Sequence, residues 1–149
     1  MNDERPHAGL QNKEHEPHFH TVSLILFNKA GSVLMQHRSI DAPTSPGLFG
    51  LFGGHIEEGE TPEHALIREV QEELGILAEN YSFLETKEET HDNALVTRHL
   101  FAMPYVDGLS FTVQEGQGVR WVSLDEIETL PMQKHIREYL KMHLPALHA

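Results

Sequence analysis

The chain has 149 residues, of which 39% are hydrophobic, and this length and composition predict one domain with a substantial buried core. It contains no cysteine, which excludes disulfides, cysteine-ligated zinc and thiol nucleophiles. The 23 acidic residues outnumber the 11 basic ones, and a formal net charge of −12 argues against long nucleic acid as the main partner.

Residues 1–17 are polar and lack the apolar segment of a signal peptide, and we expect them to form a flexible tail. Residues 18–149 are left as a single domain. No apolar run approaches the length that crosses a membrane, so we expect a cytoplasmic protein without a membrane partner.

The first elements along the chain are predicted to be strands. Residues 20–27 and 32–38 predict a hairpin around a turn at 28–31, and a loop rich in Pro and Gly follows at 39–50. A short segment at 51–52 then precedes two glycines.

A helix is predicted from residue 62 to 74. Thr61 is a good N-cap, Pro62 suits the first helical position, and Gly75 can end the helix. A second strand pair is predicted at 81–90 and 94–103, and a last strand at 119–122. Residues 123–126 resemble a capping box that opens a short helix, and 132–143 predict a terminal helix. These elements indicate α/β layers with a mixed sheet.

Three glutamates share one stripe of the helix at 62–74. Because each helical residue advances by about 100°, Glu73 and Glu72 fall roughly 40° and 60° to either side of Glu69. Leu66, Ile67, Val70 and Leu74 fall on an adjoining side that faces the core. Clustered carboxylates are hard oxygen ligands that suit Mg²⁺, Mn²⁺ or Ca²⁺, and they suit zinc poorly.

The run from residue 54 to 76 resembles the Nudix box position for position. The matching residues are Gly54, Glu60, Arg68, Glu69, Val70, Glu72, Glu73, Gly75 and Ile76. The resemblance implies the Nudix α/β/α sandwich over about residues 18–145. It also implies a metal-dependent hydrolase that cleaves the pyrophosphate bond of a nucleoside diphosphate linked to another group X. Mg²⁺ is the expected cofactor, with Mn²⁺ as a second option.

The box suggests a role for each of its polar residues. Glu69, Glu72 and Glu73 are expected to be metal ligands and catalytic residues, and the resemblance makes Glu69 the general base. Arg68 is counted with the catalytic set, although its counterpart in relatives pairs with a loop acid, for which Glu60 is the candidate here. Gly54 is expected to allow close backbone approach to substrate and to bind metal through its carbonyl.

Three further residues are candidates on weaker grounds. Glu57 is either a metal ligand or a solvated carboxylate. Arg38 either faces substrate phosphates, as a basic group does in relatives, or forms a surface salt bridge. Glu115 lies in a loop where several relatives keep an extra acidic ligand or base, and it is included as a catalytic candidate.

The box leaves the substrate open. Nucleoside triphosphates, nucleotide sugars, ADP-ribose and dinucleoside polyphosphates are all candidates, and Phe52 stands where many relatives that hydrolyse damaged nucleotides have Pro. The related prenyl diphosphate isomerases use a cysteine, which this chain lacks. A non-catalytic nucleotide-binding regulator with the same fold is the alternative function. A homodimer is a further expectation, because many relatives pair.

Overall fold

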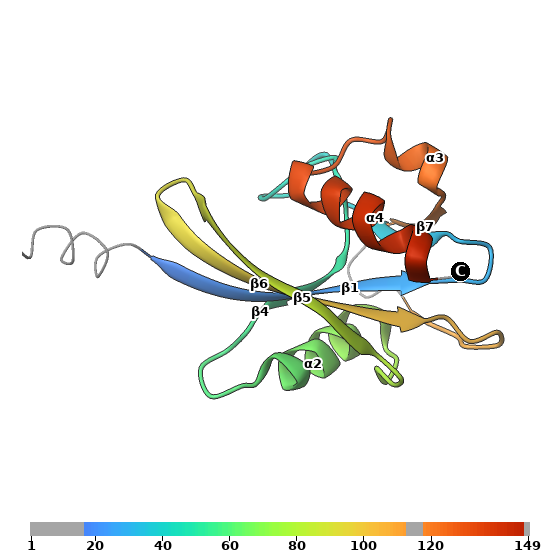
Figure 1. Ribbon diagram of the computed structural model, residues 1–149, viewed down its shortest axis with the longest axis horizontal. Coiled ribbons are helices and arrows are strands. Elements are labelled where there is room, and N and C mark those ends of the chain that lie inside the picture. The colour runs from blue at the N-terminus through green and yellow to red at the C-terminus, as the bar shows by residue number, and fades with distance from the viewer. Residues whose placement is uncertain (1–16, 113–117, 148–149) are drawn as a thin grey trace, which may run out of the picture.

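The computed structural model describes residues 17–112 and 118–147, which form a seven-stranded sheet between helices. Figure 1 shows α2 on one face of the sheet and α3 and α4 on the other. In chain order the elements are β1 (His18–Phe27), β2 (Val33–His37), β3 (Phe49–Gly50), β4 (Phe52–His55), α2 (Pro62–Leu74), β5 (Ser82–His91), β6 (Ala94–Pro104), β7 (Gly118–Val122), α3 (Leu124–Ile127) and α4 (Lys134–Leu147).

β1 is the central strand of this mixed sheet. It pairs in parallel with β6 along its whole length, and antiparallel with β4 on its other side from Thr21 to Leu24. β2 meets β1 only at the register pair Phe27↔Val33, and its longer partner is β7. The predicted strands at 20–27 and 32–38 are therefore confirmed, but their hairpin is short because β4 occupies most of that side of β1.

The alternation of side chains along β1 creates two hydrophobic cores. Val22, Leu24 and Leu26 pack toward α2, whereas Ile25 packs toward α4. Of the helix residues, Leu66 and Leu140 are fully buried on the two sides. A sheet that is apolar on both faces needs a helical layer on each, so the predicted α/β/α sandwich is confirmed.

The helix bounds agree with the predictions except at the C-terminal helix. Ser123 and Glu126 form the expected capping box of α3. α4 begins two residues later than predicted and continues past residue 143, because the chain goes on to bury Leu144 against the core. No helix in the described ranges is long and apolar enough to cross a membrane.

The strand pair β5 and β6 extends beyond the helices as a long hairpin arm (Figure 1). Its two-residue turn is made by Asp92 and Asn93, which both have positive φ, as a tight hairpin turn of the primed types requires. β6 thereby presents Val96 and Arg98 alongside β1, next to the first turn of α4.

Candidate active site

The helix that carries the glutamates begins and ends as predicted. The Thr61 hydroxyl accepts a hydrogen bond from the His64 N–H (3.1 Å), and Pro62 occupies the first turn. Gly75 closes the helix in the left-handed conformation, and its N–H donates to the Gln71 carbonyl (2.9 Å). Residues 62–74 therefore form a regular helix, and the spacing argument applied to the glutamates is valid.

The three glutamates of the stripe lie in different surroundings. The Glu69 side chain is 15% exposed and the Glu72 side chain 58%. Glu73 accepts a hydrogen bond from the Gly53 N–H (2.9 Å), which ties the C-terminal end of α2 to β4. The stripe therefore runs from solvent at Glu72 to the sheet at Glu69 and Glu73.

The two glycines of β4 make close backbone approach possible. A Cβ atom on Gly54 would lie 2.6 Å from the Glu69 Cδ, so only glycine leaves room for that carboxylate. Gly53 has φ +145°, and a Cβ there would lie 2.9 Å from the Ser23 Cα. The immediate neighbour of Gly54 is therefore Glu69, and the close approach of substrate to this backbone stays a prediction.

Arg68 connects the loop before α2 to the acidic stripe. Its Nε and Nη2 donate to the Glu60 carboxylate at 2.7 and 2.9 Å, as the resemblance implied. Its Nη1 donates to Glu69 (3.1 Å) and Glu72 (3.4 Å), and its Nη2 also donates to the His55 carbonyl (3.0 Å). One guanidinium therefore fixes the loop and offsets repulsion within the stripe.

These contacts perturb the acids unequally. The hydrogen bonds from the Arg68 side chain and the Glu57 backbone lower the pKa of Glu60 to about 2, and the same Glu60 pair raises the pKa of Arg68. Burial raises the pKa of Glu69, although Arg68 opposes that shift. Glu69 is thus a poorly solvated carboxylate, which a nearby cation would stabilise.

The stripe is not drawn together into one ligand cluster. Within residues 17–112 and 118–147, no three His, Asp or Glu side chains converge as a group that could hold a metal ion. Arg68 bonds to Glu69 and Glu72, and Glu73 is turned toward Gly53. The donor chemistry fits a hard divalent cation, since a carboxylate that accepts one hydrogen bond keeps further lone pairs with which to bind an ion.

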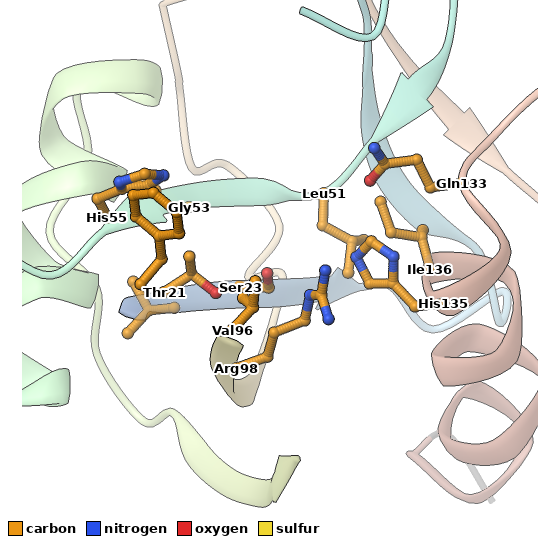
Figure 2. Close-up of a pocket in the computed structure, with 13 residues that line it drawn as sticks. Thr21, Ser23, Leu51, Gly53, His55, Val96, Arg98, Gln133, His135 and Ile136 are labelled. Carbon is orange, nitrogen blue, oxygen red and sulfur yellow. The ribbon is translucent and has the colours of Figure 1, made fainter. Parts of the chain in front are cut away.

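Two adjoining cavities open beside β4. The sheet cavity, of about 340 Å³, lies on the α4 face of the sheet and is bordered by Gly53 and Gly54 (Figure 2). The loop cavity, of about 200 Å³, is bordered by Arg38, Gly53 and Glu73. Glu73 itself lines the loop cavity, whereas the sheet cavity reaches only the backbone of β4. The loop cavity therefore offers the space for a molecule whose phosphates lie at the stripe, and it adjoins the sheet cavity at Gly53.

The weaker candidates have different placements. Arg38 borders the same cavity as Glu73, but its Nε and Nη2 already donate to the carbonyl (2.7 Å) and hydroxyl (3.1 Å) of Thr44. Glu57 is exposed and lies 3.7 Å from the Arg68 Nη1. Glu115 lies outside the described residues. The phosphate-binding, metal-binding and catalytic roles of these three stay predictions.

Sequence reasoning missed Arg98 and His135, which border the sheet cavity from β6 and α4. The sequence did hold one indication for Arg98. It lies on the same face of β6 as Val96 and Leu100, where the alternation of the strand predicts an apolar residue. No sequence pattern connects His135 with the box, because only the folded chain brings His135 to the cavity that Gly54 borders.

The comparisons with known proteins agree on the family. The NUDIX domain model matches residues 17–142. The chain is 34% identical over 100 residues to the 8-oxo-dGTP diphosphatase of Escherichia coli, which covers 67% of this chain and 76% of that protein. It is also 31% identical over 97 residues to the NAD-capped RNA hydrolase NudC of Pseudomonas aeruginosa, and there it matches 64% of this chain but only 34% of the relative.

Solved structures share the fold. A MutT structure from a study of Aliivibrio salmonicida and Vibrio cholerae superimposes with a TM-score of 0.70 at 22% identity, covering 87% of this chain and 99% of that one. The NUDIX domain of Shewanella oneidensis NrtR, solved with ADP ribose, gives a TM-score of 0.73 at 21% identity, with coverage of 91% and 92%. With the box intact and the family model matching most of its length, the chain belongs to the NUDIX domain family, as a hydrolase of phosphorus-containing acid anhydrides.

Proposed function

We propose that this chain is a Mg²⁺-dependent hydrolase that cleaves the pyrophosphate bond of a nucleoside diphosphate linked to another group X. The observation that carries the proposal is the stripe of Glu69, Glu72 and Glu73, of which Glu69 and Glu73 lie against the Gly53–Gly54 backbone that borders two cavities. Phosphate oxygens and these carboxylates are both anionic, so a cation between them is required for productive binding.

Mg²⁺ is the proposed cofactor, with Mn²⁺ as a second option, and Glu69, Glu72 and Glu73 are its proposed ligands. The Gly54 carbonyl and Glu57 are additional candidates. When bound, the ion would neutralise phosphate oxygens and acidify a water molecule. Hard carboxylate oxygens and the absence of cysteine from the sequence support this choice of metal.

The chain's own residues divide the remaining work. Glu69 is the proposed general base, since its buried carboxylate has a raised pKa and accepts a proton more readily than an exposed glutamate. Arg68 is a positioning residue that holds the loop at Glu60 and turns toward Glu69. Arg38 is proposed to contact phosphates from the loop cavity, and Glu115 to act as an extra acidic metal ligand or base.

The names of the relatives define the substrate panel. They include an 8-oxo-dGTP diphosphatase, NAD-capped RNA hydrolases and a CTP pyrophosphohydrolase of Escherichia coli that is 26% identical over 111 residues. All three names describe nucleotide derivatives, so a nucleotide-type substrate is the shared class. The chain spans about a third of NudC, so NAD-capped RNA is one test compound among several.

A release assay with Mg²⁺ and with chelator tests the proposal. The panel comprises nucleoside triphosphates with normal and oxidised bases, nucleotide sugars, ADP-ribose and dinucleotides, with phosphate and pyrophosphate resolved as separate products. We expect turnover of at least one class with Mg²⁺ and none with chelator. Metal-independent turnover would contradict the metal assignment. Folded protein that binds nucleotides and Mg²⁺ but hydrolyses none of them would favour the non-catalytic regulator.

A further inference from the structure

The sheet cavity has a polar wall on the side away from the glycines. We use polar wall for Arg98 of β6, His135 in the first turn of α4, and Gln133 just before that helix. In Figure 2, Arg98 and His135 extend toward each other across one end of the cavity, while Thr21 and His55 lie at the other. The wall is built from segments far apart in the sequence, and the box motif does not include it.

Arg98 is a partly buried cation with unused donors. Its side chain is 13% exposed, and its Nη1 donates to the Glu89 carboxylate, which lies on β5. Among the described residues, Glu89 is the one acceptor bonded to this guanidinium, which carries five N–H groups. Because Glu89 balances the charge, the free donors favour an uncharged acceptor such as a carbonyl oxygen over a dianion.

His135 and Gln133 add acceptors to the same wall. Burial, and next the positive charge of Arg98, lower the pKa of His135 to about 4, so its ring is neutral at pH 7 and keeps one acceptor nitrogen. The Gln133 Nε2 donates to the Ser45 hydroxyl (3.1 Å), which leaves the Gln133 Oε1 as an acceptor. The wall therefore presents fixed donors at Arg98 beside acceptors at its two neighbours.

The position of the cavity relates the wall to the glutamates. Gly53 and Gly54 border it, and their backbones contact Glu73 and Glu69. Phe19 and Leu51 give it apolar surface of the kind on which a nucleobase rests its face. The loop cavity, which Glu73 lines, shares Gly53 and Gln133 with the sheet cavity, so a nucleoside whose phosphates lie at the stripe reaches Arg98 through the loop cavity.

We propose that the polar wall selects the base of the substrate, an assignment that rests on the hydrolase function proposed above. The preferred base carries a ring carbonyl next to a ring N–H, as in hypoxanthine, guanine or uracil. Its carbonyl accepts from Arg98, and its N–H donates to His135 or Gln133. Adenine carries an amino group at the carbonyl position and would bring a donor against the donor-only guanidinium.

ITP and ATP form a matched pair for the test, since they differ only in the carbonyl and N–H of hypoxanthine against the amino group and bare nitrogen of adenine. We expect the wild-type kcat/KM for ITP to exceed that for ATP by at least about tenfold, the discrimination of one good base contact. The double variant Arg98→Gln/Glu89→Gln removes both charges together and avoids an unpaired carboxylate. It should bring the ratio close to one.

Lys87→Gln is the control, because Lys87 is exposed on β5 opposite Arg98 and borders neither cavity. It should leave the ratio unchanged. Thermal melts show whether each variant is folded. Wild-type selectivity for ATP, equal rates on both nucleotides, or a ratio that the double variant leaves intact would each overturn the assignment.

A second measurement separates this assignment from the hydrolase proposal. Calorimetric titration of the wild-type protein with IMP and with AMP measures base selection without turnover. Tighter binding of IMP, lost in the double variant, would support the polar wall even if no triphosphate is hydrolysed. Hydrolysis of ITP and ATP at equal rates, with equal binding of both monophosphates, would leave the hydrolase proposal standing and reject base selection.

Discussion

The Glu69 carboxylate lies against the backbone of Gly54, so closely that a Cβ on that glycine would fall 2.6 Å from the Glu69 Cδ. The box glycine and the first glutamate of the stripe are therefore one structural unit. β4 leaves the position empty so that a carboxylate can be buried beside the strand that borders both cavities.

Replacing Gly54 with Ala should abolish most activity and leave the fold in place. The new methyl group would displace Glu69, while the Gly54 backbone itself has no positive φ to strain. We expect a fall in kcat of at least about a hundredfold, the scale on which small misplacement of a reacting group acts. Gly50→Ala is the control, since a Cβ there meets nothing within 4 Å. Equal loss in both variants would show that any added methyl in this region is harmful.

Glu72→Gln should reduce turnover by orders of magnitude without unfolding the protein. Glu72 is the most exposed member of the stripe and loses only the 3.4 Å contact with Arg68, so its stability role is small. The reason for the rate loss is that one anionic oxygen disappears from the proposed metal site without a change of shape. Glu63→Gln, in the first turn of the same helix, is the matched control. An unchanged rate in Glu72→Gln with Mg²⁺ present would reject the stripe as the metal site.

The sequence allows this part of the site to be predicted because its geometry is local. Glu69, Glu72 and Glu73 lie at helical spacing, so the period of one helix fixes their relation. Glu60 lies in the loop just before that helix, close enough along the chain to pair with Arg68. Arg98 and His135 meet only after β6 pairs with β1 and α4 packs over the sheet. The β1–β2 contact was overestimated for a similar reason, since β4 competes for the same edge of β1.

The ion pair between Arg68 and Glu60 should stabilise the folded protein at neutral pH and lose this effect in acid. The folded-state pKa of Glu60, about 2, lies below its ordinary value of 4.5, so the pair stabilises the fold above pH 4.5. That contribution is lost as the pH falls from about 4.5 to about 2. Glu60→Gln should lower the urea midpoint at pH 7, and its difference from wild type should shrink across this window. Glu58→Gln, at an exposed position in the same loop, is the control that keeps the pair between Arg68 and Glu60.

The lowered pKa of His135 predicts a second loss of folding stability in acid, which begins at a higher pH than the loss caused by Glu60. The folded-state pKa of His135, about 4, lies below its ordinary 6.5, so the unfolded chain binds the extra proton first. The contribution of His135 to folding stability is complete above pH 6.5 and is lost as the pH falls toward 4. His135→Gln should remove this slope from a series of urea titrations. A slope that persists in the variant would assign the effect to another histidine.

Tyr139 lies beside His135, with ring centroids 5.8 Å apart at 90°, and its hydroxyl is buried without a hydrogen-bond partner among the described residues. Burial raises its pKa to about 12. A buried donor without an acceptor costs stability, so Tyr139→Phe should stabilise the protein by about 1 kcal/mol and raise its melting temperature. Tyr81→Phe, at a less buried position, should change stability little. A lower melting temperature of Tyr139→Phe would contradict this and would mean that the hydroxyl has a hydrogen-bond partner in solution.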